Sequence, residues 1–329
     1  MSENIDPRSL LIADYSYQLP EEKIARYPLP ERDAAKLLVY DEGSIETRQF
    51  KDLPGLLPSG SLLVLNNAKV VHARLLFKKE TGGLVEIFCL EPASRYSDMT
   101  IAMAQKGEVY WQCLVGGAAK WKDGQVLKME QGDGSILSAT MEARNSDDFC
   151  IHFSWLNPDF SFAEILDIFG KVPLPPYMNR ASEEVDESSY QTVFAVNEGS
   201  VAAPTASLHF TSDVLENLRE SGVEIARLTL HVGAGTFKPV KAETAGGHNM
   251  HSEWIEVSEQ ALLQLLQQGE RPIIAAGTTA LRTLESIYWF GQKIFNANGE
   301  VVDVFTLGQW DAYSVPENEL CTRKEALEA

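Results

Sequence analysis

The side chains best suited to chemistry lie between residues 199 and 239, where histidines and threonines alternate with very small residues. His209, His231, Thr205 and Thr236 offer hydrogen-bond donors and acceptors. Their neighbours include residues small enough for the backbone to approach a bulky group: Ala202, Ala203, Ala206, Gly233, Ala234 and Gly235. This combination predicts a pocket for a polar ligand with a flat ring.

His209 and His231 are the predicted proton-transfer residues, because imidazole titrates near neutral pH. A lone histidine more often satisfies a buried backbone group. Here a threonine follows each histidine within a few residues, and Gly233 and Gly235 flank the second one. The pairing favours a functional role over a purely structural one.

Two predicted elements connect the halves of this stretch. Residues 211–222 predict a short helix, because Thr211 is a good N-cap residue and Gly222 is a common helix stop. Residues 228–232 alternate between apolar and polar types, which predicts a strand whose Thr229 and His231 point away from the core. We expect these elements to return both halves of the stretch to one place.

A second polar cluster contains His248, His251 and Glu253. Two histidines and a carboxylate on one helix face can bind a metal. Gly246 and Gly247 favour a loop instead, so we expect substrate positioning here, with structural hydrogen bonding as the alternative.

Residues 273–277 predict a buried strand, and Thr278 and Thr279 are expected to cap the helix that follows it. A helix N-terminus offers unpaired N–H groups that suit a carboxylate or a phosphate. Ordinary capping by Thr278 is the alternative.

A proline-rich turn at residues 173–176 precedes Tyr177, Arg180, Tyr190 and Gln191. Such a turn can hold aromatic and guanidinium planes in position for stacking on a base. Plain packing of the tyrosines is the alternative.

The formal net charge of −19 weighs against a nucleic-acid partner, because affinity for RNA depends largely on neutralising phosphates. Basic residues are concentrated near Arg74 and Lys78, however, and a strand there places both opposite Leu75 and Phe77. This face is a candidate for phosphate contacts, with an ordinary solvated strand as the alternative. The acidic run at residues 183–187 is expected to be a solvated loop.

With 329 residues and 44% hydrophobic content, the chain is long enough for two domains with real cores. Its apolar runs are shorter than the roughly 20 residues of a membrane span, and residues 1–8 are too polar for a secretory signal. The cysteines are widely spaced without a paired-ligand pattern: Cys89, Cys113, Cys150 and Cys321. We therefore expect reduced thiols and a cytoplasmic protein.

The period of the hydrophobic residues changes along the chain. Between residues 66 and 155, short β-like runs alternate with glycine-containing turns, which predicts a small antiparallel β-barrel. Helices and strands mix elsewhere: residues 161–170 begin with a capping box, and residues 258–268 carry an apolar stripe. We expect a discontinuous mixed α/β main domain, residues 1–65 and 156–329, with the barrel domain of residues 66–155 inserted into it.

Several short motifs occur in one order along residues 15–286, and together they are far more specific than any single pattern. They lie at Arg180 and at residues 17–20, 32–33, 52–54, 66–67, 81–83, 173–177, 190–193, 199–211, 229–239, 248–253 and 277–285. This set resembles the S-adenosylmethionine:tRNA ribosyltransferase-isomerase family of queuosine biosynthesis.

The resemblance implies transfer and isomerisation of the ribosyl part of S-adenosylmethionine. The acceptor would be the 7-aminomethyl-7-deazaguanine at the tRNA wobble position, and the products epoxyqueuosine-tRNA, adenine and methionine. Such chemistry needs a base for the carbon next to the sulfonium, stabilisation of the departing adenine, and exclusion of water. The resemblance also implies a two-domain fold and no metal.

The candidate residues take expected roles from this resemblance. His209 and His231 are expected to transfer protons. S-adenosylmethionine is expected to contact Thr205, Gly233, Gly235, Thr236, Thr278 and Thr279. The tRNA is expected to contact Tyr177, Arg180, Tyr190, Gln191, His248, His251, Glu253, Arg74 and Lys78.

The chain departs from the family pattern in two places. Ser207 stands where the family usually has glycine, which would narrow the pocket beside His209. Residues 289–329 contain no match to the family's Asn-Phe-His-Leu-Pro motif, and a capping box at residues 322–325 opens a helix too short to persist alone. We expect the natural reading frame or a partner chain to supply the missing part.

Two other functional classes stay open. A catalytically silent or incomplete tRNA-binding relative would bind tRNA without releasing adenine, and both departures favour it. A metal-dependent hydrolase built on His209, His231, His248 and His251 is the weaker alternative, which metal analysis of the purified protein would test.

Overall fold

The computed structural model describes residues 6–79, 81–145, 148–178, 180, 182–237, 240–297 and 306–329. The chain divides into two compact units. The first unit comprises residues 1–66, 209–230 and 238–329, and the second comprises residues 67–208 and 231–237. The expected domain boundary at residues 155 and 156 stays a prediction.

A four-stranded sheet forms the centre of the described part of the first unit, in the order β13-β12-β3-β14. β3 (Leu62–Asn66) lies parallel to both β12 (Glu224–His231) and β14 (Ile273–Ala275), and β13 (Trp254–Glu256) adjoins β12. Every residue of β3 is buried. Continuous burial is expected of a central parallel strand covered on both faces.

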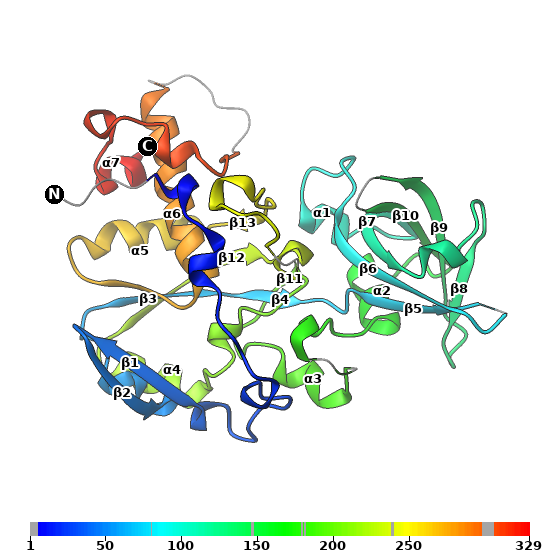
Figure 1. Cartoon of the computed structure of the whole chain (residues 1–329), viewed down its shortest axis with the longest axis horizontal. Helices are drawn as coiled ribbons and strands as arrows, with labels where there is room; N and C mark the ends of the chain where they lie inside the picture. The colour runs from blue at the N-terminus through cyan, green and yellow to red at the C-terminus, as the bar shows by residue number, and fades with distance from the viewer. Residues whose placement is uncertain are drawn as a thin grey trace. The chain divides into compact units, whose positions relative to one another are not determined.

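Four helices of the first unit, counted over its described residues, are α4 (Ser212–Glu220), α5 (Glu259–Gln268), α6 (Thr278–Asn296) and α7 (Arg323–Glu328). α4 confirms the helix predicted after residue 211, because the Thr211 side chain accepts a hydrogen bond from the Val214 N–H. α7 has its predicted capping box and packs against α5 and α6 (Figure 1), which explains how so short a helix is stabilised.

The core of the first unit lies between this sheet and the helices of its C-terminal half. It contains Leu62, Val64, Ala226, Leu228, Leu265 and Ala280. A separate antiparallel hairpin, β1 (Lys36–Asp41) and β2 (Ser44–Gln49), is largely exposed.

The described part of the second unit contains the predicted antiparallel barrel, a six-stranded sheet in the order β5-β6-β7-β10-β9-β8. Its edge strands, β5 and β8, pack against each other, so the sheet is nearly closed (Figure 1). The strands are β5 (Arg74–Lys78), β6 (Leu84–Pro92), β7 (Glu108–Gly116), β8 (Leu127–Glu130), β9 (Ile136–Arg144) and β10 (Phe149–Trp155). The mixed α/β fold with an antiparallel barrel is therefore confirmed.

Helix α2 (Phe162–Phe169) packs against the barrel core through Phe162, whose ring centroid lies 4.8 Å from that of Trp111 and 5.6 Å from that of Phe153. Its capping box, formed by Ser161 and Glu164, is the one predicted from the sequence.

The other strands and α-helices described for the second unit lie outside the six-stranded sheet. β4 (Ala68–Val70) pairs in parallel with β11 (Asn197–Ser200), and the helices are α1 (Met99–Met103) and α3 (Glu184–Ser189). Residues 183–187 are not the predicted loop, although all of them except Asp186 are exposed as predicted. Glu183 and Asp186 form a capping box that starts α3, and Asp186 is 2% exposed.

Candidate functional site

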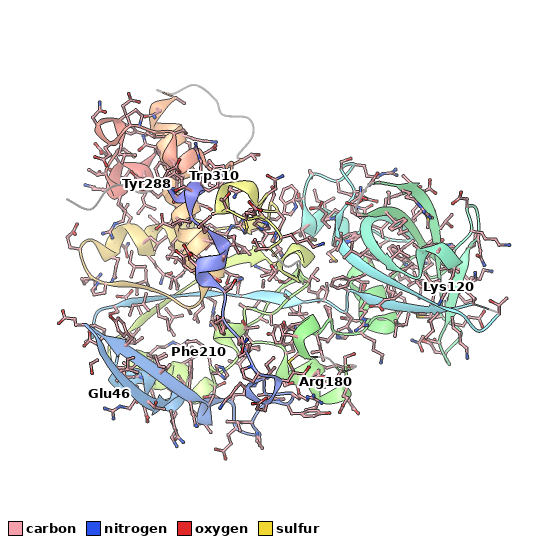
Figure 2. The ribbon with its side chains drawn as sticks, in the orientation of Figure 1. Glu46, Lys120, Arg180, Phe210, Tyr288 and Trp310 are labelled. Carbon is pink, nitrogen blue, oxygen red and sulfur yellow. The ribbon has the colours of Figure 1, made fainter. Side chains whose placement is uncertain are left out.

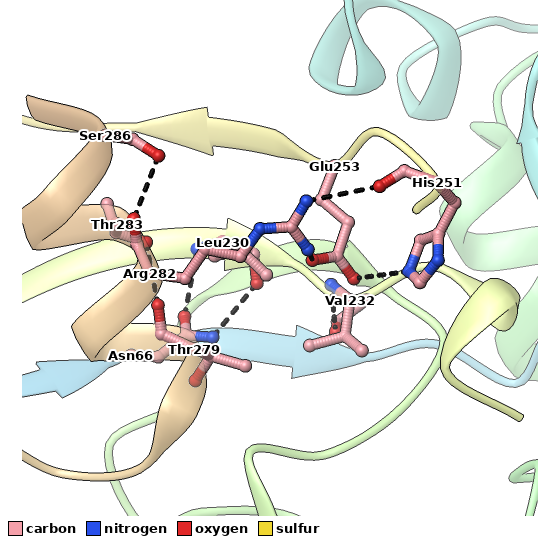
Figure 3. A network of polar contacts seen from close by, with 10 residues as sticks. Asn66, Leu230, Val232, His251, Glu253, Thr279, Arg282, Thr283 and Ser286 are labelled. Carbon is pink, nitrogen blue, oxygen red and sulfur yellow. Dashed lines mark hydrogen bonds and ion pairs between the residues drawn. The ribbon is translucent and has the colours of Figure 1, made fainter. Parts of the chain in front are cut away.

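Three polar side chains of the first unit form one connected network (Figure 3). His251 Nε2 lies 3.2 Å from Glu253 Oε1, and Arg282 Nη1 donates to Glu253 Oε2 at 2.5 Å. A second nitrogen of Arg282, Nη2, donates to the His251 carbonyl at 3.2 Å. The guanidinium therefore holds both the carboxylate and the backbone that carries the imidazole.

Two elements of secondary structure, β13 and α6, position the members of this network. Glu253 immediately precedes β13, and Arg282 lies early in α6. The side chain of Glu253 is 5% exposed, whereas those of His251 and Arg282 are 31% and 39% exposed. The carboxylate is thus shielded and paired through both oxygens, while the imidazole stays open to solvent.

Helix α6 begins differently from the prediction. Its N-cap is Gly277, with φ of +89°, and no side chain caps it. Thr278 and Thr279 are the first helical residues, so the prediction that Thr278 caps the helix is wrong. Glycine fits here because the chain leaves β14 through a left-handed turn that other residues rarely adopt.

Asn66 fixes the end of β12 in the first unit (Figure 3). Its Nδ2 donates to the Leu230 carbonyl at 3.0 Å, and the Leu230 N–H donates to its Oδ1 at 3.0 Å. Asn66 is fully buried. The side chain therefore continues the ladder between β3 and β12 past the last residue of β3.

The expected orientation of the β12 residues is wrong. Thr229 and His231 are 2% and 3% exposed, as buried as the apolar residues between and beside them. Alternation predicts a strand with one buried face, whereas the last four residues of β12 are buried on both faces, as is usual for a strand inside a parallel sheet.

Within the second unit, the backbone of residues 199–202 lies along Val232. The Val201 N–H donates to the Val232 carbonyl at 2.9 Å, and the Val232 N–H donates to Ser200 Oγ at 3.0 Å. Ser200 Oγ in turn donates to the Ala202 carbonyl at 2.8 Å. The structure thus places residues 200–202, from the first half of the predicted pocket segment, beside Val232, from its second half.

Gly199 approaches His231 closely. It has φ of +129°, and a Cβ built on it would lie 2.5 Å from Met99 Cγ and 2.9 Å from His231 Nδ1. Both the backbone conformation and the lack of space therefore require glycine at this position.

The short helix η8 (Thr205–Ser207) lies within the predicted pocket segment. In this helix, Thr205 is exposed and Ser207 is fully buried. Ser207 Oγ makes no hydrogen bond within the described part of the chain. At η9 (Ala234–Phe237), the Thr236 N–H donates to the Gly233 carbonyl at 3.2 Å. Gly235 also lies in η9, and Lys238 and Pro239 fall outside the described residues.

The residues after the proline-rich turn have structural partners in the second unit. Arg180, labelled in Figure 2, pairs with Asp186 through two hydrogen bonds of 2.6 and 2.7 Å. Gln191 accepts from the Val70 N–H at 3.0 Å and donates to the Val70 carbonyl at 3.2 Å, so it extends the edge of β4.

The two tyrosines near these residues differ in environment. Burial raises the pKa of Tyr190, whereas Tyr177 is 61% exposed. Tyr190 thus packs within the protein and Tyr177 is accessible, and stacking of either ring on a base stays a prediction.

The remaining predicted histidines lie in the first unit. His209 is exposed, with its ring centroid 5.4 Å from that of Phe50. Nearby, Thr211 Oγ1 donates to Asp33 Oδ2 at 3.2 Å, which connects two segments that were predicted as separate motifs. His248 is half-buried, and its carbonyl accepts from Gln309 Nε2 at 2.9 Å.

On strand β5 of the second unit, Leu75 and Phe77 are fully buried, as predicted. On the opposite face, Arg74 Nε donates to Glu86 Oε1 at 2.5 Å, while Lys78 is exposed. The charge of Arg74 is thus partly neutralised, and Lys78 is the more accessible cation.

The predicted site residues fall in both units. His209, His248, His251, Glu253, Thr278 and Thr279 belong to the first unit, and the other predicted site residues belong to the second. A hollow of about 330 Å³ in the second unit is lined by Lys171, Val172, Ser182, Glu183, Glu184 and Glu187. A wider groove of about 700 Å³ in the first unit is lined by Arg48, Lys51, Asp52, Pro54, Gly55, Leu56, Asn217, Glu220 and Ser221. Neither lining includes a predicted site residue, and a common pocket for the histidines stays a prediction.

Sequence reasoning did not assign roles to Asn66 and Arg282. Asn66 belongs to one of the short motifs along residues 15–286, and Arg282 belongs to the helix predicted after residue 277. Both act on residues far away in sequence, 164 positions for Asn66 and 29 for the Arg282–Glu253 pair.

Two kinds of feature, metal-ligand groups and membrane-spanning helices, are absent from the described residues. These residues contain no group of three or more histidine, cysteine, aspartate or glutamate side chains arranged to hold a metal ion. None of their helices is long and apolar enough to cross a membrane.

Comparison with known proteins gives consistent matches. The chain matches the family described as queuosine biosynthesis protein over residues 12–312. It is 39% identical to the S-adenosylmethionine:tRNA ribosyltransferase-isomerase of Trichlorobacter lovleyi, over 84% of this chain and 76% of that protein. The protein of the same name from Treponema denticola is 38% identical, over 90% of this chain and 82% of the relative. The crystal structure of the S-adenosylmethionine tRNA ribosyltransferase from Thermotoga maritima is 28% identical, covers 83% of this chain and 72% of its own, and has a TM-score of 0.35.

Proposed function

The chain belongs to the queuosine biosynthesis protein family, and we propose on this ground that it is an S-adenosylmethionine:tRNA ribosyltransferase-isomerase. It transfers and isomerises the ribosyl part of S-adenosylmethionine onto the 7-aminomethyl-7-deazaguanine of the tRNA wobble position. Epoxyqueuosine-tRNA, adenine and methionine are the products. The observation that carries the proposal is the similarity, over most of the chain, to relatives that bear this enzyme's name.

S-adenosylmethionine is the ribosyl donor in this proposal, and it contacts small and hydroxyl-bearing residues. These are Thr205, Gly233, Gly235, Thr236, Thr278 and Thr279. The close approach of Gly199 to His231 supports the assignment in the second unit, because the backbone beside this histidine leaves no room for a Cβ. The start of α6 supports it in the first unit, because no side chain occupies its N-cap position.

The tRNA is the ribosyl acceptor, and the proposed contacts to it come from polar, basic and aromatic residues. These are Tyr177, Arg180, Tyr190, Gln191, His248, His251, Glu253, Arg74 and Lys78. The exposure of Tyr177 and Lys78 supports their part in this set, since stacking and phosphate contacts both need accessible side chains. The polar groups of Arg180, Gln191 and Tyr190 have protein partners, so besides contacting tRNA these residues would fix the surface that carries Tyr177.

The reaction requires proton transfer at two places, the carbon next to the sulfonium and the departing adenine. We propose His209 and His231 for proton transfer. The exposed ring of His209 supports its role, as does the confinement of His231 beside Gly199.

A catalytically silent tRNA-binding relative was the alternative function. It is not favoured, because the relatives that match most of this chain are named as the enzyme. We further propose a cytoplasmic location and a reaction without a metal, so adenine release should continue in excess chelator.

The proposal is tested by incubating the protein with S-adenosylmethionine and tRNA that carries the aminomethyl-deazaguanine. Adenine and methionine should be released in equal amounts, and nucleoside mass analysis should detect epoxyqueuosine. Binding of tRNA without adenine release would support the silent relative instead.

A further inference from the structure

We propose that His251 is the base that removes the proton from the carbon next to the sulfonium, with Glu253 and Arg282 as its positioning residues. This inference rests on the proposed function and assigns one of its proton transfers to a residue. The contacts of His251 with Glu253 and Arg282 all lie within the first unit.

The network around His251 has the arrangement that an oriented base requires. Glu253 Oε1 lies 3.2 Å from Nε2 of the imidazole, and the other carboxylate oxygen is held by Arg282 at 2.5 Å. A carboxylate fixed on one ring nitrogen orients the ring and selects the tautomer with hydrogen on that nitrogen. Nδ1 of His251 is then left with its lone pair for a substrate proton.

Burial distinguishes this pair from the other histidine–carboxylate pairs in the described residues. His152 lies 3.0 Å from Glu108, but the Glu108 side chain is 63% exposed. His72 lies 3.6 Å from Asp167, which is 49% exposed. Water competes for such carboxylates, so they orient an imidazole poorly.

Glu253, in contrast, is 5% exposed, while the His251 side chain is 31% exposed. The orienting carboxylate is shielded and the proton-accepting ring is accessible. If the hydrogen bond were purely structural, the imidazole would not need to be accessible. If the pair were an ordinary solvated surface pair, the carboxylate would not need to be shielded and bound to an arginine.

The chemical step is a simple proton transfer. Nδ1 of neutral His251 takes the proton, and the electron pair of the broken C–H bond stays on the carbon, where the adjacent sulfonium stabilises it. The resulting imidazolium is a cation beside the ionised Glu253, which stabilises it electrostatically. This assignment takes the proton transfer at carbon away from His209 and His231, which keep the transfer to the departing adenine, and it replaces the tRNA contact proposed above for His251.

The main test variant is His251→Gln, because an amide can still donate to Glu253 but cannot accept a proton as a base. Its kcat for adenine release should fall about 100-fold or more, which is the usual contribution of general-base catalysis. The KM for S-adenosylmethionine should change less than threefold. His152→Gln is the matched control at an exposed pair and should leave both constants unchanged.

Two further variants separate catalysis from structure. In His251→Ala, added imidazole should restore part of the lost rate, because the open ring position leaves space for it. In Glu253→Gln, kcat should fall about 10- to 100-fold, as expected when an orienting partner is lost. Circular dichroism and thermal unfolding check each protein, and His251→Asn replaces the glutamine variant if that variant does not fold.

The outcomes are distinguishable. A folded His251→Gln protein with unchanged kcat, or with a raised KM alone, overturns the assignment of the base. Failure of imidazole to restore any rate also counts against it. A wild-type protein that releases no adenine overturns the proposed function together with this inference, whereas an active wild-type protein confines any failure to His251.

Discussion

Two buried residues control the position of the histidines at the scale of single side chains. Gly199 provides the space beside His231, and Asn66 holds Leu230, the residue before it in the chain. Neither residue is a candidate for chemistry, yet each constrains the backbone next to a residue that is. Substitution of either residue should therefore lower the stability of the protein and, as a consequence, change the position of the backbone next to His231.

Gly199→Ala should destabilise the protein by about 2–4 kcal/mol, from the positive φ together with the clash against Met99 and His231. Urea unfolding measures the effect. Gly132→Ala is the matched control, since a Cβ at Gly132 meets nothing within 4 Å. Equal stability of the two variants would show that the close approach of Gly199 is not a constraint.

Asn66→Ala should lower the free energy of unfolding by about 2–5 kcal/mol, because it leaves the buried N–H and C=O of Leu230 without partners. Asn157→Ala is the control: Asn157 also accepts a backbone hydrogen bond, but at an exposed position where water replaces it. If Asn66→Ala lowers the free energy of unfolding no more than Asn157→Ala does, the buried hydrogen bonds of Asn66 do not have the role assigned to them.

The elements that carry the site differ in how far the sequence predicts them. α4 and α2 follow directly from their caps and apolar stripes, because helix signals are local. α3 was missed, since its acidic composition suggested solvation, whereas one carboxylate caps the helix and another pairs with Arg180. Local charge does not reveal a partner that folding brings close.

The same limit applies to the candidate site. His251 and Glu253 were predicted from their residue types, but the role of Arg282 depends on folding, which brings α6 to the segment just before β13 and which no local pattern encodes. The sequence also does not predict the burial of His231, because alternation in β12 indicates one exposed face, whereas residues 228–231 are buried on both faces.

The Arg180–Asp186 pair predicts a specific pH dependence of stability. Hydrogen bonding from Arg180, with a smaller effect of the Glu183 N–H, lowers the pKa of Asp186 below its ordinary value of 3.8. A depressed pKa stabilises the folded state above the unfolded-state pKa, and this stabilisation is lost as the pH falls through the folded-state pKa.

The wild-type protein should therefore be more stable than Asp186→Asn at neutral pH, and the difference should shrink as the pH falls below 3.8. Denaturant titrations of both proteins across this range measure it. A difference that stays constant through the acid range would contradict the assigned role of the ion pair.

At the scale of the whole molecule, the net charge of −19 makes binding of tRNA depend on local groups of cations. On β5, Arg74 is paired with Glu86 and Lys78 is exposed. Lys78 is therefore the residue of this proposed face whose charge is most available to a phosphate.

Lys78→Glu should raise the KM for tRNA about threefold to tenfold and leave the KM for S-adenosylmethionine unchanged, because only the polyanion senses the reversed charge. Lys128→Glu, an exposed change on β8 of the same barrel, is the control. If both variants raise the KM for tRNA equally, β5 has no special part in tRNA binding.

The central claim concerns the fate of S-adenosylmethionine, and one measurement tests it most directly. The protein is supplied with S-adenosylmethionine that is isotopically labelled in its ribosyl carbons and with tRNA that bears the aminomethyl-deazaguanine. Mass analysis of the digested tRNA should find the labelled carbons in epoxyqueuosine, with equal amounts of free adenine and methionine. Unlabelled tRNA, or tRNA that has gained only a methyl group, would contradict the account.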